Sequence, residues 1–181
     1  MKAYSIILMT VLMSHLATAQ NVLMDKKAVA HFYSDAPIED IEATNEEAIG
    51  AIDLTKGTVA VSMLIRNFHF DKSLMEEHFN ENYLESEKYP KALFKGKIQD
   101  FESLDFTQTG TFTAMAIGEL EIHGVTRPIK SDVNFEITDN SIQAKTLFKV
   151  ALEDHDIKIP KLVIKNIAEV VDVDVTFNFE K

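Results

Sequence analysis

The segment of residues 78–97, HFNENYLESEKYPKALFKGK, gathers side chains that could do chemistry. It holds a histidine, two asparagines, three glutamates and four aromatic residues within one short stretch. Histidine with nearby carboxylates is the usual material of a metal site or of acid–base catalysis. His78 and Asn82 are four residues apart, as are Glu77 and Glu81, and residues at this spacing share one face of a helix. The segment is therefore the first place to look for a metal site or an active site.

The spacing fits neither kind of site. A zinc helix carries two histidines one turn apart, whereas the partner of His78 is an asparagine and no other histidine lies at ligand spacing. The glutamates fall on the outer face of an expected helix, where they are solvated, so no carboxylate pair with separated pKa values arises. The chain also has no GxSxG elbow and no glycine-rich phosphate loop. We therefore expect no metal, no cofactor and no catalytic residue, and an enzyme is the less favoured class.

A short helix is the element that must position this segment. Ser73 and Glu76 fit the SxxE capping box, in which each side chain satisfies a backbone donor at a helix start. Pro90 ends the helical stretch, because the residue before a proline is pushed out of helical geometry. The pattern predicts a helix that begins at Ser73 and stops before Pro90.

This helix has one apolar face, formed by Met75, Phe79 and Tyr83 at four-residue spacing. We expect that face to lie over the mouth of the fold as a lid, either contributing to a binding cavity or filling the core. His78 and Asn80 are expected to fasten the lid by hydrogen bonds.

The remainder of the chain alternates apolar and polar residues, which is typical of strands with one dry face. The clearest pair is a hairpin of residues 129–137 and 142–152 that turns at Asp139 and Asn140. Further strands are expected at 58–68, 92–101, 112–122 and 171–180, with weaker ones at 28–34 and 50–54. Residues 35–50 are acidic and polar, and we expect a long loop there.

About seven or eight antiparallel strands with one or two short helices predict an all-β fold. A barrel of about eight strands removes exposed sheet edges and has room for side chains or one small ligand. A two-sheet sandwich fits the same pattern. Ala114, Ala116 and Gly118 share the inner face of one strand and leave space inside, which favours the barrel with a lumen.

Composition limits the compartment and the partners. Residues 1–19 have the layout of a secretory signal peptide, so we expect export, cleavage after Ala19 and one domain over residues 20–181. No later run of apolar residues is long enough to insert stably in a membrane. The net charge of −11 and only two arginines argue against nucleic acid as a partner. The chain has no cysteine, which excludes disulfides and thiolate metal sites, and the sequence leaves a homodimer open.

Two segments resemble the signatures of YceI-like proteins: HFNENYLESEKYPKALFKGKI and, farther on, GELEIHGVTRPIKSDVNF. The matching residues are His78, Phe79, Tyr83, Tyr89, Pro90, Phe94, Gly96, Gly118, Leu120, Gly124, Val125, Thr126 and Pro128. The resemblance implies an extended, lipocalin-like antiparallel barrel with an elongated apolar lumen. It also implies export to the bacterial periplasm and a long polyisoprenoid as ligand, and some members are associated with stress responses.

The function we expect is a periplasmic protein that carries or sequesters a polyisoprenoid or isoprenoid quinone without catalysis. Residues expected to line the lumen or the lid are Phe68, Met75, Phe79, Tyr83, Phe94, Ile98, Phe112, Phe135 and Phe148. An anionic head group would need cations near the mouth, and Arg66, Lys91 and Lys95 are the candidates. The alternatives are an envelope stress or interaction protein with a filled lumen, and an enzyme acting on an isoprenoid lipid.

Overall fold

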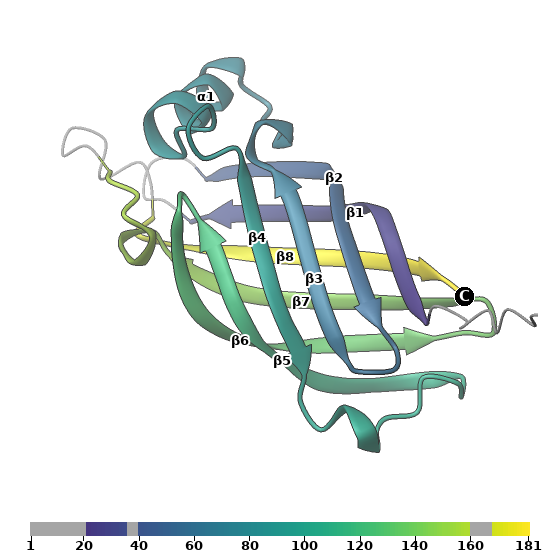
Figure 1. Cartoon of the computed structure of the whole chain (residues 1–181). Coiled ribbons are helices and arrows are strands. Elements are labelled where there is room, and N and C mark those ends of the chain that lie inside the picture. Colours follow the sequence, from purple (N-terminus) through teal and green to yellow (C-terminus); the bar gives the residue numbers. More distant parts are fainter. Residues whose placement is uncertain (1–20, 36–39, 160–167) are drawn as a thin grey trace, which may run out of the picture.

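A computed structural model describes residues 21–35, 40–159 and 168–181, which form a closed barrel of eight antiparallel strands (Figure 1). Each strand pairs with its neighbours along the chain, and β8 closes the barrel by pairing with β1. The strands are β1 Val22–Ser34, β2 Ile41–Asp53, β3 Thr58–Leu64, β4 Lys91–Ile98, β5 Gly110–Ile122, β6 Val125–Ile137, β7 Ser141–Ala151 and β8 Val170–Glu180. The predicted all-β barrel is confirmed, and the sandwich is wrong.

The helical elements are all short. They are the 3₁₀ turns Ile65–Asn67, Phe101–Ser103 and Leu152–His155, the helix α1 Ser73–His78 and the π-helical turn Phe79–Tyr83. Residues 65–90, between β3 and β4, lie at one end of the barrel, and the β4–β5 connection lies at the opposite end (Figure 1). We call the segment 65–90 the lid.

The predicted alternation holds most clearly in β6. Val133, Phe135 and Ile137 are buried inside the barrel, while the polar residues between them are exposed. The same pattern recurs in β5, β7 and β8. Because side chains on a strand alternate between faces, each strand supplies one apolar row to the lumen.

The first two strands are longer than predicted, and the expected loop over residues 35–50 is wrong for residues 41–50, which belong to β2. The strict alternation that identifies a strand is interrupted in both. Asp25 and Ala28 are successive buried positions in β1, and so are Asn45 and Ala48 in β2. The register between β1 and β2 shifts at these places. An extra residue in a bulge breaks the period of two, so the pattern underestimates both strands.

Buried polar side chains hold these bulges. The Asp25 carboxylate accepts the Lys27 N–H at 2.8 Å and the Asn178 N–H of β8 at 2.7 Å. The Asn45 amide oxygen accepts the Glu47 N–H at 2.9 Å, and its nitrogen donates to the Leu64 carbonyl at 2.9 Å. Each side chain thus links its bulge to another strand, and the oxygen atoms of both side chains are hydrogen-bonded.

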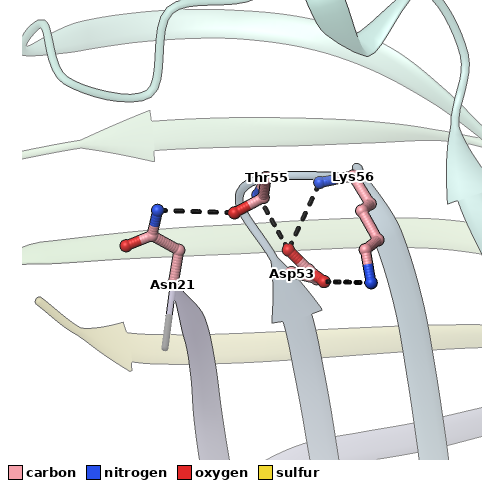
Figure 2. A network of polar contacts seen from close by, with 4 residues as sticks. All are labelled: Asn21, Asp53, Thr55 and Lys56. Carbon is pink, nitrogen blue, oxygen red and sulfur yellow. Dashed lines mark hydrogen bonds and ion pairs between the residues drawn. The ribbon is translucent and has the colours of Figure 1, made fainter. Parts of the chain in front are cut away.

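The end of the barrel opposite the lid is closed by aromatic rings and by a tight β2–β3 turn. Phe106, from the β4–β5 connection, contacts Phe101, Phe112 and Phe135 with ring centroids 5.2–5.3 Å apart. Asp53 holds the turn, accepting the N–H groups of Thr55 and Lys56 at 2.8 and 3.2 Å (Figure 2).

The turn also seals this end. Asn21 donates to the Thr55 hydroxyl at 3.4 Å beside the Asp53 contacts (Figure 2). Gly57 has a φ of +67°, and a Cβ there would lie 2.4 Å from the Phe101 ring. The ring therefore packs directly on the turn, and the lumen ends here.

Removing the side chain of Asn45 should destabilise the barrel. Asn45→Ala leaves the Leu64 carbonyl and the Glu47 N–H without their partner, so the free energy of unfolding should fall by about 1–3 kcal/mol. Urea unfolding followed by far-UV circular dichroism measures this change. Glu46→Ala, at an exposed position of the same bulge, is the control and should change the free energy by less than about 0.5 kcal/mol. Equal losses in the two variants would show that the buried amide is not the source of the stability.

Candidate ligand-binding site

The lumen contains two adjoining cavities. The inner cavity has a volume of about 100 Å³, and the outer cavity, beneath the lid, has a volume of about 300 Å³. Four residues line both cavities: Met63, Ala92, Leu120 and Phe148. The outer cavity lies within the size range of natural small-molecule sites. The lumen is therefore not filled by its own side chains.

The wall of the inner cavity is apolar. Its lining includes Ile52, Val61, Phe94, Ile98, Ala116, Val133, Phe135, Ala144, Val175, Phe177 and Phe179. Ser131 and Thr146 carry the only hydroxyl groups among its lining residues. These hydroxyls lie 2.7 Å apart and also bond the Leu147 and Asp132 carbonyls, so their donors are used within the wall. Among the described residues, a ligand in this cavity meets no free hydrogen-bond donor.

Small residues make the space, although one of them works differently from the expectation. Ala116 and Ala144 line the inner cavity as short side chains. Gly96 and Gly118 face each other across β4 and β5, and a Cβ at either would lie 2.6 or 2.8 Å from the Phe94 ring. The ring thus lies against the glycines along the wall. Gly118 accommodates Phe94 and does not leave an empty space, and the lumen stays open because the ring lies flat.

The lid supplies the outer cavity with an aromatic roof. Phe79 contacts Phe32 of β1 at 5.5 Å, Phe68 at 5.7 Å and Phe70 at 5.0 Å between ring centroids. Met75 and Tyr83 line the same cavity. The prediction that Met75, Phe79 and Tyr83 form one inward apolar face is confirmed. Aromatic contacts of this geometry add to the stabilisation from burial, so they hold the lid on the barrel.

The start of the lid helix differs from the predicted capping box. Lys72 is the N-cap, Ser73 is already helical, and no side-chain capping bond forms. Glu76 instead accepts the Phe70 N–H at 3.3 Å and lies 3.4 Å from the His69 ring nitrogen. Its carboxylate thus ties the helix to the preceding loop. The capping box is wrong because Glu76 finds partners upstream of the helix.

The end of the helix widens into a π-helical turn, in which the Leu84 N–H bonds the Phe79 carbonyl at 2.9 Å. The expected continuous helix up to Pro90 is therefore wrong, since the α-helical part ends at His78. Asn80 donates to the Glu76 carbonyl at 2.9 Å within the lid itself, and the side chain of His78 makes no hydrogen bond within the described residues. Neither side chain bonds the described part of the barrel, so the expectation that they fasten the lid is wrong.

Three polar side chains of the described residues line the outer cavity. His78 and Tyr83 have no hydrogen-bond partner among the described residues, and the buried Ser34 hydroxyl accepts the Ala168 N–H at 2.9 Å. Burial raises the pKa of the Tyr83 phenol above its usual value, so Tyr83 is a neutral donor at physiological pH. These groups can bond an oxygen atom on a ligand, whereas the inner cavity cannot.

A hydrogen-bonded latch closes the far end of the lid. His123, with its side chain 10% exposed, lies in the β5–β6 turn and packs edge-on against Tyr89 at 4.4 Å. One ring nitrogen is 3.1 Å from the His155 carbonyl and the other is 2.9 Å from the Glu85 carboxylate. Both partners accept hydrogen bonds, so each bond needs a hydrogen on the ring nitrogen that faces it. The sequence pattern does not predict this contact, because Glu85 and His123 are 38 residues apart.

The structure brings most of the predicted site residues to the cavities. Phe94, Ile98 and Phe135 line the inner cavity, while Phe68, Met75, Phe79 and Tyr83 line the outer one and Phe148 lines both. Phe112 lies at neither; it stacks on Phe135 at 5.2 Å in the closed end. The prediction that Phe112 faces inward is correct. Alternation does not show how far along the barrel a residue lies.

The three predicted head-group cations do not reach the lumen. Lys91 and Lys95 are exposed on β4, where Ala92 and Phe94 occupy the inward positions between and beside them. Arg66 is exposed on the 3₁₀ turn after β3. None of them lines either cavity. On β4, alternation turns Lys91 and Lys95 outward. The positions of the three cations therefore give no support to the expected head-group role.

Phe32, Phe70 and Val173 also line the outer cavity and were missed. Phe32 follows the buried positions Ala28 and Ala30 at a spacing of two, so the signal was present in a strand that seemed weak.

Within the described residues, no helix is long and apolar enough to cross a membrane. No group of histidine and acidic side chains in this part of the chain is arranged to hold a metal ion.

Comparisons with known proteins give one family and several similar folds. The model of the YceI-like domain matches residues 18–179. No curated protein sequence matches the chain. A polyisoprenoid binding domain from Saccharophagus degradans, implicated in plant cell wall breakdown, is 14% identical with a TM-score of 0.76, over 89% of this chain and 98% of that one.

Two further structures are similar. Burkholderia cenocepacia BcnA is 13% identical with a TM-score of 0.70, over 84% of this chain and 96% of that one. The Campylobacter jejuni YCEI protein is 14% identical with a TM-score of 0.58, over 100% of this chain and 99% of that one. At this identity, the likeness shows that the fold is shared.

Loss of the latch should loosen the lid without unfolding the barrel. His123→Phe keeps an aromatic ring against Tyr89 but removes both hydrogen bonds, so amide exchange in residues 84–90 should accelerate by about threefold to tenfold. Hydrogen–deuterium exchange read by mass spectrometry measures this rate. His31→Phe is the matched control, because His31 pairs with Asp174 and Glu42 on the outside of the barrel. Unchanged exchange in His123→Phe would mean that the latch does not hold the lid.

Proposed function

The chain belongs to the YceI-like domain family, and from this premise we propose that it carries or sequesters a long apolar lipid in the barrel lumen. The ligand class is a polyisoprenoid or an isoprenoid quinone. The observation that carries the proposal is the dry lumen, in which two adjoining cavities are lined almost wholly by apolar side chains. Burial of a hydrocarbon chain there stabilises the complex by about 25 cal/mol for each Å² of apolar surface removed from water.

The lining also supports binding without catalysis. Among the described residues, no titratable side chain lines the inner cavity and only His78 and Tyr83 line the outer cavity. These two groups lie at the lid, where they can orient a ligand, and no carboxylate of the described residues lines either cavity. An enzyme acting on the lipid would need an acid and a base close to the reacting atoms. The lining of the lumen therefore suits binding of the lipid's hydrocarbon chain.

An envelope protein with a filled lumen is the other candidate. It predicts side chains that fill the barrel, and the two cavities weigh against it.

We further propose that the protein acts in the periplasm, after removal of residues 1–19. The support is the basic, apolar and small-residue layout of this segment. Export would place the carrier between two membranes, where a hydrocarbon chain needs protection from water.

Lipid should accompany the protein through purification. Native mass spectrometry of protein isolated from its own host, followed by organic extraction, should show one reproducible bound lipid with a long isoprenoid chain. The apolar lumen favours this result because an empty apolar cavity of this size forgoes contacts that a chain would make. Protein that is consistently free of lipid, and that takes up none from added prenyl alcohols, would contradict the proposed function.

A charge in the inner cavity should expel the lipid. Phe94→Glu places a carboxylate among apolar residues with no cation nearby, and burial of an unpaired charge is costly. Lipid retention measured by native mass spectrometry should be lost, while the far-UV circular dichroism spectrum keeps its β-sheet form. Lys95→Glu is the control, since its side chain is exposed on the same strand and adds the same charge outside. If the folded Phe94→Glu variant retained as much lipid as this control, the lumen would not be the binding site.

A further inference from the structure

We propose that Met63 and Phe148 form a movable partition across the lumen and that this partition sets the chain length of the bound lipid. The inference rests on the proposed function. It assigns a specificity role to two side chains that, so far, are only part of the lining.

The position of the partition follows from the cavities themselves. Met63 comes from β3 and Phe148 from β7, and both line the inner and the outer cavity. Ala92, the partner of Met63 on β4, and Leu120 on β5 complete the ring of four shared residues. The boundary between the cavities is therefore made of side chains from four strands, and the backbone does not close it.

Two of these side chains can move and two cannot. Ala92 has no rotatable side-chain bond beyond its methyl group, and Leu120 is buried in a cluster with Val150 and Val171. Met63 and Phe148 are only partly buried and pack against the edge of the core. A methionine is unbranched and adapts to irregular space, and a phenylalanine can change its χ1 rotamer where one side is empty. Both neighbouring cavities provide that space.

The polar groups determine the direction in which a lipid lies. Ser34, His78 and Tyr83 are at the outer cavity, whereas the hydroxyls of the inner cavity are already bonded within the wall. A lipid with an oxygen-containing head therefore keeps its head beneath the lid and points its hydrocarbon tail toward the closed end. Only the tail reaches the partition.

Chain length then decides whether the partition opens. A short chain fits in the outer cavity and leaves Met63 and Phe148 in place. A longer chain must displace them from their preferred rotamers, and it gains burial in the inner cavity in return. The aromatic closed end around Phe106 and Phe135 sets the upper limit. The balance between displacement and burial fixes the preferred length.

Competition between prenyl alcohols of different length tests this inference. Equimolar farnesol, geranylgeraniol and solanesol are added to delipidated full-length mature protein, and the bound fraction of each is read by native mass spectrometry. Phe148→Ala removes the larger half of the partition, so the ratio of bound solanesol to bound farnesol should rise by about tenfold over wild type. Leu147→Ala is the matched control, because Leu147 is the adjacent residue on β7 and is 65% exposed.

A second variant changes the partition in the opposite direction. Ala92→Leu adds bulk beside Met63, so the same ratio should fall while farnesol still binds. It also keeps the test decisive if Phe148→Ala fails to fold. If wild type binds all three alcohols and the folded variants bind them in the same ratio as wild type, the partition is overturned. The proposed function then stays intact. Absence of binding for every alcohol in wild type would overturn both.

Discussion

Closure of β1 against β8 is the constraint on which the rest of the structure depends. The register from Val29–Thr176 to Tyr33–Asp172 completes a ring of hydrogen bonds, so the sheet has no free edge. In a closed ring, every second residue of each strand must face the interior. The bulge at Asp25 adjusts β1 to both of its neighbours, and the Asp25 carboxylate bonds β8 directly. Burial of that carboxylate is tolerated because its acceptors are used.

The ring of eight strands encloses more space than its inward-facing side chains fill. Alanines at positions 28, 30, 43, 48, 114, 116 and 144 are buried along the inner face. The large rings lie where they close an end or cover a wall, as Phe106 does at the closed end and Phe94 does over Gly96 and Gly118. The space that remains is apolar and continuous with the lid. Its shape suits a chain that contributes hydrocarbon and one polar end.

Alternation in the sequence was sufficient for the fold but not for depth along the barrel. It correctly predicted that Phe94, Phe135 and Phe148 face inward, because the side a residue faces depends only on the period of two. It could not distinguish Phe112, in the closed end, from residues at the cavities. Strand stagger sets that depth, and stagger depends on pairing between segments far apart in sequence.

Other features could not be predicted because they depend on contacts between distant segments. The bulges at Asp25 and Asn45 broke the period that reveals a strand, so β2 resembled a loop. The latch joins Glu85 of the lid to His123 in the β5–β6 turn, and neither residue alone indicates this contact in the sequence. Lys91 and Lys95 were candidates only because of their proximity in sequence to the lid. Alternation within β4 turns them outward, which a stricter use of the same rule would have shown.

The position of the lipid tail distinguishes binding in the lumen from binding at the lid or on the outer surface. A crystal structure of the protein loaded with solanesol, a long prenyl alcohol, brominated at the end far from its hydroxyl would locate the tail by anomalous scattering. Binding in the lumen predicts a single bromine peak in the inner cavity, near Phe135 and Phe177, with the hydroxyl beneath the lid near Tyr83. A bromine peak at the lid, or on the outer surface of the barrel, would contradict it.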